Sequence, residues 1–285
     1  MNSAQAGAPR AAGSGDRAAT RINHHREGSG PPLVLLHGIG LRWQINQPII
    51  ARLAGEHEMI ACDSPGFGQS PPLPDAMRPT IVAYATAFED FFAEQELERP
   101  HLVGNSMGGA IALELARRGS ARSVTAISPA GFWSPPERRF CQLSLAPLTQ
   151  TPQTARAMIE ALARTRPGRL ALLWQVFGHP SRVPVEVVVA TLRDAWAAPA
   201  FAGALAAFED YGFAEGEQLT DTPVTIAWGL HDRLLPHRTQ AARARRLLPS
   251  ARHLTLGVGH VPFYDDPAVV AEAIRTSASA GVGAS

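Results

Sequence analysis

Short apolar runs recur along this chain and alternate with longer amphipathic stretches. Polar and apolar positions do not alternate within the runs, which indicates strands that are covered on both faces. The runs lie at residues 33–36, 59–61, 102–103, 124–127, 224–228 and 253–256, and amphipathic helices are expected at 81–95, 110–118 and 238–248. Strands alternating with helices predict an α/β fold with a mostly parallel central sheet and helices on both faces.

The alternation of strands and helices stops after Gly131. From residue 132 to residue 213 the chain contains no convincing central strand and is typical of several helices, with Pro152 and Pro184 each at a first helical position. The β-branched stretch 185–189 is compatible with a strand, but the preceding proline favours a helix. Most aromatic residues of the chain also lie in this segment. We therefore predict an inserted helical cap with an apolar pocket beneath it, lined in part by Trp133.

Domain boundaries follow from these patterns. The α/β core is expected to comprise residues 22–131 and 214–277, with the cap at 132–213 between them. The two ends of the chain, 1–21 and 278–285, are rich in small and polar residues. Both ends are therefore expected to be flexible tails.

Composition restricts the classes of partner. The 285 residues are 45% hydrophobic and 18% charged with a formal net charge of +1, so neither nucleic acid nor a membrane surface is an expected partner. No stretch approaches the ~18 consecutive apolar residues of a membrane span, and the first residues lack the apolar core of a secretory signal. We expect a cytoplasmic protein with a small-molecule substrate, and the oligomeric state stays open. All basic side chains are arginine, which suggests a GC-rich bacterial coding sequence.

The two cysteines, Cys62 and Cys141, are not part of any Cys/His cluster. A structural or catalytic metal is therefore not expected, and both cysteines are predicted to be buried free thiols.

The segment Gly104-Asn105-Ser106-Met107-Gly108 carries the main candidate for chemistry. It follows an apolar run and precedes a helical one, which places the serine on a sharp strand-to-helix turn with a glycine two residues to either side. Such a turn exposes the hydroxyl at a helix N-terminus, where free amides and the helix dipole favour negative charge. Ser106 is therefore a candidate nucleophile, and Asn105 is expected only to tolerate the strained turn. The same pentapeptide can also arise by chance in a glycine-rich chain.

A serine nucleophile needs a base and a carboxylate that orients this base. Asp232 follows the predicted strand 224–228, and His260 follows the strand that ends at residue 256. Both would then lie at the carboxyl edge of the sheet, where open α/β sheets place their ligands. Taken alone, His260 could be a surface histidine and Asp232 could close a turn, with Asp210 and Asp221 as alternative carboxylates.

The chain order Ser106, Asp232, His260, together with His37-Gly38 after the first strong strand and the turn Asp63 to Ser70, resembles the α/β-hydrolase superfamily from about residue 22 to residue 274. Some members, such as haloalkane dehalogenases and epoxide hydrolases, have an aspartate nucleophile, and serine at this position argues against both. The resemblance implies an oxyanion hole from the amides of Met107 and Ile39, with Gly40 as an alternative to Ile39.

The glycines Gly38 and Gly40 would let this loop approach the substrate carbonyl, while His37 is expected to shape the loop rather than act as a base. An apolar, aromatic-rich cap over a serine site favours a small to medium hydrophobic carboxylic ester, cleaved without metal or organic cofactor. A hydrolase of carbon-carbon bonds in ring-cleavage products, a lactonase and a thioesterase remain alternatives. A catalytically silent binding protein on the same fold is a further one.

Overall fold

The computed structural model describes residues 20–214, 216, 219 and 222–282. Within this part of the chain, seven strands form one sheet in the order β1-β3-β2-β4-β5-β6-β7. Only the pairing of β1 with β3 is antiparallel. The strands are β1 His24–Glu27, β2 Pro32–Leu36, β3 Glu58–Cys62, β4 His101–Asn105, β5 Ser123–Ile127, β6 Val224–Gly229 and β7 Arg252–Leu256.

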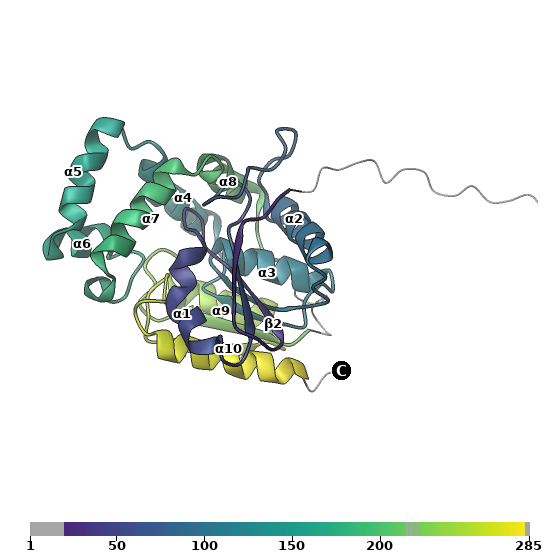
Figure 1. Ribbon diagram of the computed structural model, residues 1–285. Coiled ribbons are helices and arrows are strands. Elements are labelled where there is room, and N and C mark those ends of the chain that lie inside the picture. The colour runs from purple at the N-terminus through teal and green to yellow at the C-terminus, as the bar shows by residue number, and fades with distance from the viewer. Residues whose placement is uncertain (1–19, 215, 217–218, 220–221, 283–285) are drawn as a thin grey trace, which may run out of the picture.

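Helices cover both faces of this sheet (Figure 1). Alternate residues of β2 show why: Val34 packs into the core on one face, and Leu35 packs into the core on the other. The first face is covered by α2 Ile81–Glu94, α3 Met107–Arg117 and α9 His237–Leu247, and the second by α1 Gln47–Leu53 and α10 Pro267–Val282. Since both side-chain rows of a central parallel strand are buried, strands β2 to β6 are nearly continuous apolar runs. The predicted α/β fold is confirmed.

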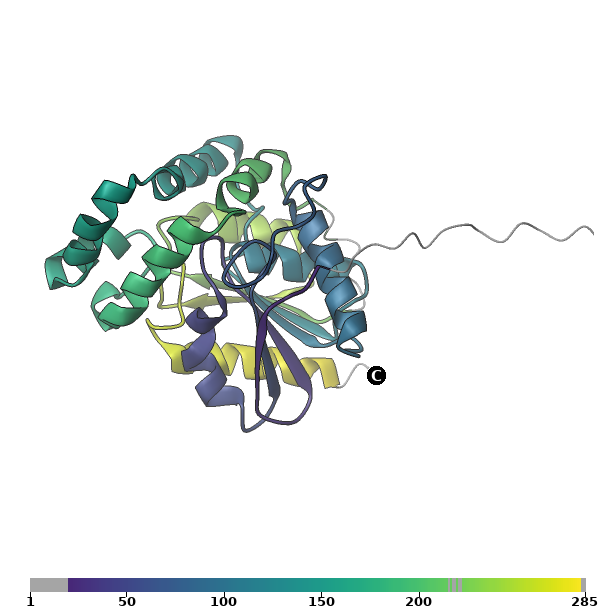
Figure 2. The same cartoon turned by 45° about the horizontal axis from the view of Figure 1, so that its top comes forward.

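The segment between β5 and β6 is helical in its described part, and we call this segment the cap. It contains α4 Pro135–Thr149, α5 Gln153–Ala163, α6 Arg166–Leu173, α7 Val185–Ala197 and α8 Phe201–Ala207. Figures 1 and 2 show these helices gathered at one side of the sheet, with α5 and α6 furthest from it. The stretch 185–189 begins α7 and is not a strand. Pro152 and Pro184 were predicted at the first helical position, and each instead is the N-cap, one residue before α5 and α7 begin.

Three elements differ from the prediction. Strand β1 was not expected, because an edge strand of sequence His-His-Arg-Glu has no apolar pattern. Helix α1 was not expected either, because it has only two turns. Helix α10 continues to Val282, although a flexible tail was expected from residue 278. Ser277 Oγ donates to Val124 O at 3.2 Å and Ala278 is 4% exposed, so this part of α10 is held against the core.

Both cysteines are buried and free, as predicted. Burial raises the pKa of the Cys141 thiol to about 12, so this thiol is un-ionised near neutral pH and a poor nucleophile. Among the described helices, none has the length and apolarity that crossing a membrane requires.

Candidate active site

Ser106 lies on the tight turn between β4 and α3. Its backbone has φ 56° and ψ −114°, a conformation that is strained for a residue with a side chain. Backbone hydrogen bonds stabilise this conformation: Ser106 N donates to Ile127 O at 3.0 Å, and Ser106 O accepts from Ala110 N at 3.0 Å. The serine therefore precedes the first turn of α3, where the helix dipole stabilises negative charge.

Close backbone contacts explain the two glycines beside this serine. A Cβ at Gly104 would lie 2.1 Å from Gly108 O, and a Cβ at Gly108 would lie 2.2 Å from Leu36 O. Both obstacles are main-chain atoms that cannot rotate away. Strand β4, helix α3 and strand β2 thus approach one another too closely for any side chain at these positions.

Asp232 and His260 meet on neighbouring loops that follow β6 and β7. His260 Nδ1 is 2.7 Å from Asp232 Oδ2, and the two residues are 2% and 5% exposed. The other carboxylate oxygen accepts from Leu234 N at 3.0 Å and from Leu235 N at 2.7 Å, which fixes its orientation. Because a carboxylate only accepts, Nδ1 of the neutral imidazole carries the hydrogen and Nε2 keeps its lone pair.

Of the two alternative carboxylates, only Asp210 is among the described residues, and it is not part of this pair. Asp210 lies in an exposed ion pair with Arg78 at 2.9 Å, and Asp221 lies outside the described residues.

The loop after β2 lies against Ser106. A Cβ at Gly38 would be 3.3 Å from Ser106 Cβ, and Ile39 and Gly40 line the same cavity as the serine. At Gly40, φ is +74° and a Cβ would lie 2.8 Å from the ring of Phe201, so both conformation and space favour glycine. Met107 directly follows Ser106 and is the first residue of α3, and the first amides of a helix have no partner within it.

His37 holds this loop in place. Its Nε2 accepts from Ser64 N at 2.9 Å, so Nδ1 carries the hydrogen and donates to Gly38 O at 2.7 Å. Burial lowers the pKa of His37 below its ordinary value, which keeps the imidazole neutral. The geometry fits a loop-shaping residue and leaves neither ring nitrogen free to act as a base.

Asp63 supports the same loop from the adjacent turn. Its carboxylate accepts from Gln69 N at 3.0 Å within the turn, from Trp43 N at 2.8 Å and from Asn23 Nδ2 at 2.7 Å. The bond to Gln69 is local and caps the turn itself. The bond to Trp43 joins the turn to the segment that continues the loop after β2.

Asn105 does more than tolerate the strained turn. Its Nδ2 donates to His260 O at 2.8 Å and to Ile127 O at 3.1 Å. The side chain thereby links the turn that carries Ser106 to the loop that carries His260. The identity of this asparagine gave no signal of that contact, because its partner lies 155 residues away in the sequence.

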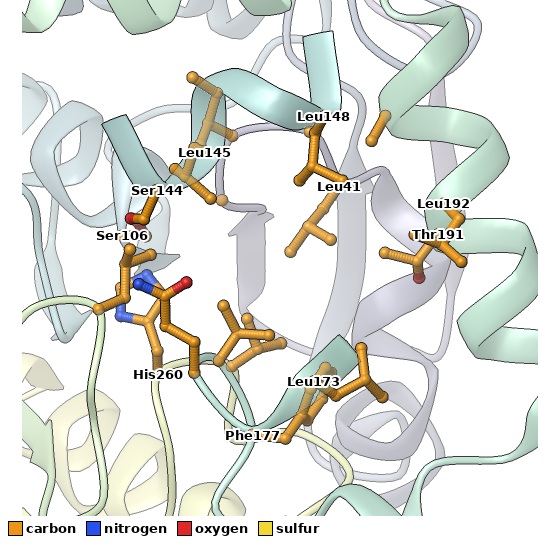
Figure 3. Close-up of a pocket in the computed structure, with 18 of the residues that line it drawn as sticks. Leu41, Ser106, Ser144, Leu145, Leu148, Leu173, Phe177, Thr191, Leu192 and His260 are labelled. Atoms are coloured by element: carbon orange, nitrogen blue, oxygen red, sulfur yellow. The ribbon is translucent and has the colours of Figure 1, made fainter. Parts of the chain in front are cut away.

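A cavity of about 240 Å³ lies between the sheet edge and the cap, and Ser106 and His260 are both on its wall (Figure 3). The rest of the wall is mostly aliphatic and comes largely from the cap. Ser144 and Leu145 lie at the Ser106 side of the cavity in this view, and Thr191 and Leu192 lie at the far side. The lining includes Leu41, Leu145, Leu148, Leu172, Leu173, Val176, Phe177, Val188, Leu192 and Phe201.

Trp133, which was expected at this cavity, is not among its lining residues. The indole Nε1 donates to Tyr211 O at 2.9 Å, and the ring packs against Phe208 with the centroids 5.2 Å apart. Trp133 lies at the junction of core and cap, where a polar atom of a buried indole finds its partner in the backbone. In the part of the chain that the structure describes, no group of three or more His, Cys, Asp or Glu side chains could hold a metal ion.

A family model described as the alpha/beta hydrolase family matches residues 33–273. An uncharacterized protein of Mycobacterium tuberculosis is 31% identical over 258 residues, which cover 85% of this chain and 73% of that protein. The epoxide hydrolase EphH of Mycobacterium tuberculosis is 33% identical over 184 residues, which cover 63% of this chain and 86% of EphH. A solved structure of a membrane phospholipase A superposes with a TM-score of 0.72 at 26% identity and covers 91% of this chain and 83% of that one.

Proposed function

The chain belongs to the alpha/beta hydrolase family, and we propose that it is a serine hydrolase that cleaves a small to medium hydrophobic carboxylic ester through an acyl-enzyme. One observation carries this proposal. A strained serine at a helix N-terminus shares a cavity with His260, whose Nδ1 is held by a buried carboxylate. These are the parts that nucleophilic catalysis by serine requires.

In the first half of the proposed reaction, Ser106 Oγ attacks the ester carbonyl carbon and its proton passes to His260 Nε2. The electron pair of the carbonyl double bond moves to the oxygen. The amides of Met107 and Ile39 are proposed to donate to this oxyanion. The tetrahedral intermediate then collapses, the C–O bond to the alcohol breaks, and His260 gives its proton to the leaving alkoxide oxygen.

In the second half, a water molecule gives a proton to His260 Nε2 and its oxygen attacks the acyl carbon. Collapse of this second intermediate breaks the bond to Ser106 Oγ, which takes the proton back from His260. Asp232 stabilises the imidazolium in both halves and holds its tautomer. No group other than protein side chains and water is needed for the balance of atoms and charge.

The cavity supports the choice of substrate class. Most of its wall is aliphatic, and its polar side chains are few: Ser144, Gln175 and Thr191 besides the catalytic residues and Asn105. An apolar acyl or alkyl group is therefore the expected occupant, because transfer of such a group from water into this cavity is favourable.

Other reactions share this arrangement. The relative EphH is named an epoxide hydrolase. Epoxide hydrolases that resemble this family have an aspartate nucleophile, whereas position 106 of this chain is serine. The epoxide reaction is therefore not the one proposed. The same arrangement of serine, histidine and aspartate can hydrolyse a carbon-carbon bond in a ring-cleavage product, a lactone or a thioester. These reactions are the second candidates.

The test is hydrolysis of p-nitrophenyl esters of increasing acyl length by wild type and Ser106→Ala. We expect turnover with an optimum chain length, and no turnover above background with the variant. A fluorophosphonate probe separates the remaining cases. Labelling at Ser106 without ester turnover would indicate a live nucleophile that cuts a different bond, and absence of both would favour a silent binding protein.

A further inference from the structure

Another buried carboxylate, besides Asp232 and Asp63, lies next to the proposed active site. Asp265 is five residues after His260 and is 1% exposed. Its Oδ2 accepts from Gly259 N at 2.7 Å, and Gly259 directly precedes His260. The same Oδ2 also accepts from Gly178 N at 2.8 Å, and Oδ1 accepts from His179 N at 2.8 Å.

Two of these three amides belong to the cap. Gly178 and His179 follow α6, some 87 residues before Asp265 in the sequence. Arg182, from the same cap segment, donates through its guanidinium to the backbone carbonyl of Asp265. A carboxylate that only stabilised its own loop would need the amide of Gly259 alone.

The cap segment also touches the His260 loop through the backbone. Val261 N donates to Val176 O at 2.8 Å, and a Cβ at Gly259 would lie only 2.3 Å from Gly178 N. The two main chains are therefore in direct contact on both sides of His260. Val176 and Val261 also line the catalytic cavity, so this junction is part of the substrate site.

The loop that Asp265 holds is tied to the turn of Asp232 as well. His231 N donates to Val258 O at 2.9 Å, and a Cβ at Gly229 would lie 2.2 Å from Gly259 O. Any shift of the 258–259 backbone would therefore change the relative position of Asp232 and His260. The 2.7 Å bond between their side chains depends on that position.

From these contacts we propose that Asp265 is a positioning residue that joins docking of the cap to alignment of His260. When the cap segment 176–182 is seated, its amides and that of Gly259 share one carboxylate, and the base is held against Asp232. When the segment leaves, two of the three hydrogen bonds to the carboxylate are lost. The proposal rests on the proposed function, because it assigns a role to His260 as the base.

The test is Asp265→Asn, measured per active site. Asparagine has nearly the same shape, but its side-chain NH₂ cannot accept, so at least one of the three backbone amides loses its partner. We expect kcat per fluorophosphonate-labelled site to fall about 10- to 100-fold and KM to rise, because small misplacement of a catalytic group has effects of that size. The Nδ1 proton resonance of His260 should broaden or disappear.

The matched control is Asp266→Asn. The carboxylate of Asp266 accepts from Val269 N at 3.1 Å, at the start of α10, and has no described bond to the cap. This variant should keep kcat, KM and the His260 resonance. If Asp265→Asn matches it per labelled site, Asp265 only stabilises the fold, and the proposal is overturned.

A second variant keeps the proposal testable if Asp265→Asn does not fold. Arg182→Ala leaves the carboxylate in place and loosens only the cap side, so KM should rise at least severalfold while the folded protein is retained. An unchanged KM would contradict the proposal. Failure of the proposed function gives a different result, because wild type itself would then show no Ser106-dependent ester turnover, whatever residue stands at position 265.

Discussion

The carboxyl ends of the central strands, where Ser106 lies, and the helical cap that covers them differ in how tightly they are packed. At the sheet edge, main-chain atoms touch one another, as between Gly104 and Gly108, and buried side chains such as Asn105 bond to backbone. In the cap, large apolar side chains reach solvent: Met158 on α5 is 70% exposed and Trp174 after α6 is 54% exposed. The proposed nucleophile thus lies where close backbone contacts leave little room for substitution, and most of the cavity wall comes from the cap, where more substitutions fit.

The largest effect is expected at the base itself. His260→Ala should lower kcat/KM by about 10⁴-fold or more, because the nucleophile loses its general base and the leaving group its acid. Urea unfolding should show a much smaller change than this, since the side chain has few partners other than Asp232. Ester turnover near the wild-type rate would refute the assignment of His260.

The next largest effect tests the rigidity of the sheet edge. Gly108→Ala would place a Cβ 2.2 Å from Leu36 O, and the backbone on both sides has no room to move. We expect a loss of about 3 kcal/mol or more in the free energy of unfolding, measured in urea. Gly55→Ala is the control, because nothing lies within 4 Å of its Cβ position and its change should stay within about 0.5 kcal/mol.

The dependence of stability on pH tests the burial of a histidine in the core. Burial lowers the pKa of His101, on β4, to about 4 from its ordinary value of 6.5. Between these two values the unfolded chain binds the proton and the folded one does not, so stability falls as the pH falls. This residue alone should remove up to about 3 kcal/mol between pH 7 and pH 4.

His101→Gln should flatten that dependence. Its unfolding free energy, compared with wild type across pH 4 to 7, should show a smaller slope even if the value at pH 7 is lower. An equal slope in both proteins would mean that other groups cause the acid sensitivity. His37, whose pKa burial also lowers, contributes in the same direction and should leave a residual slope.

The smallest effect is expected in the cap. Leu192 on α7 lies at the side of the cavity away from Ser106 (Figure 3), so Leu192→Ala should move the optimum acyl chain to greater length. The loss of unfolding free energy should be about 1–3 kcal/mol, because the side chain is 8% exposed and part of it faces the cavity. Met158→Ala, at an exposed position of the cap, should leave both quantities unchanged.

Much of the fold could be predicted because its signals are local. Strands β2 to β6 are apolar runs, and the helix-rich segment from 132 to 213 is marked by prolines and by the missing strands. What could not be predicted has no local pattern. The polar edge strand β1 is defined by its partner β3, and helix α10 extends past residue 277 because Ser277 bonds to Val124 on a distant strand.

The candidate site shows the same difference between local signals and contacts with distant residues. Ser106, Asp232 and His260 were identified because each follows a strand with its own turn signal, and the fold brings the ends of neighbouring parallel strands together. Trp133 was expected at the cavity from composition alone, and its place was decided by a hydrogen bond to Tyr211, 78 residues away. A residue type does not determine which surface its side chain will meet.

The sequence by itself determined the family, the sheet and the three residues proposed for catalysis, since hydrophobic period and turn chemistry act over a few residues. Only the tertiary structure decided how these parts are held in register. The bond from Asn105 to His260 spans 155 residues and that from Asp265 to Gly178 spans 87. Such contacts arise only after the chain has folded, because they depend on the distances between elements and not on the residues that lie next to each other.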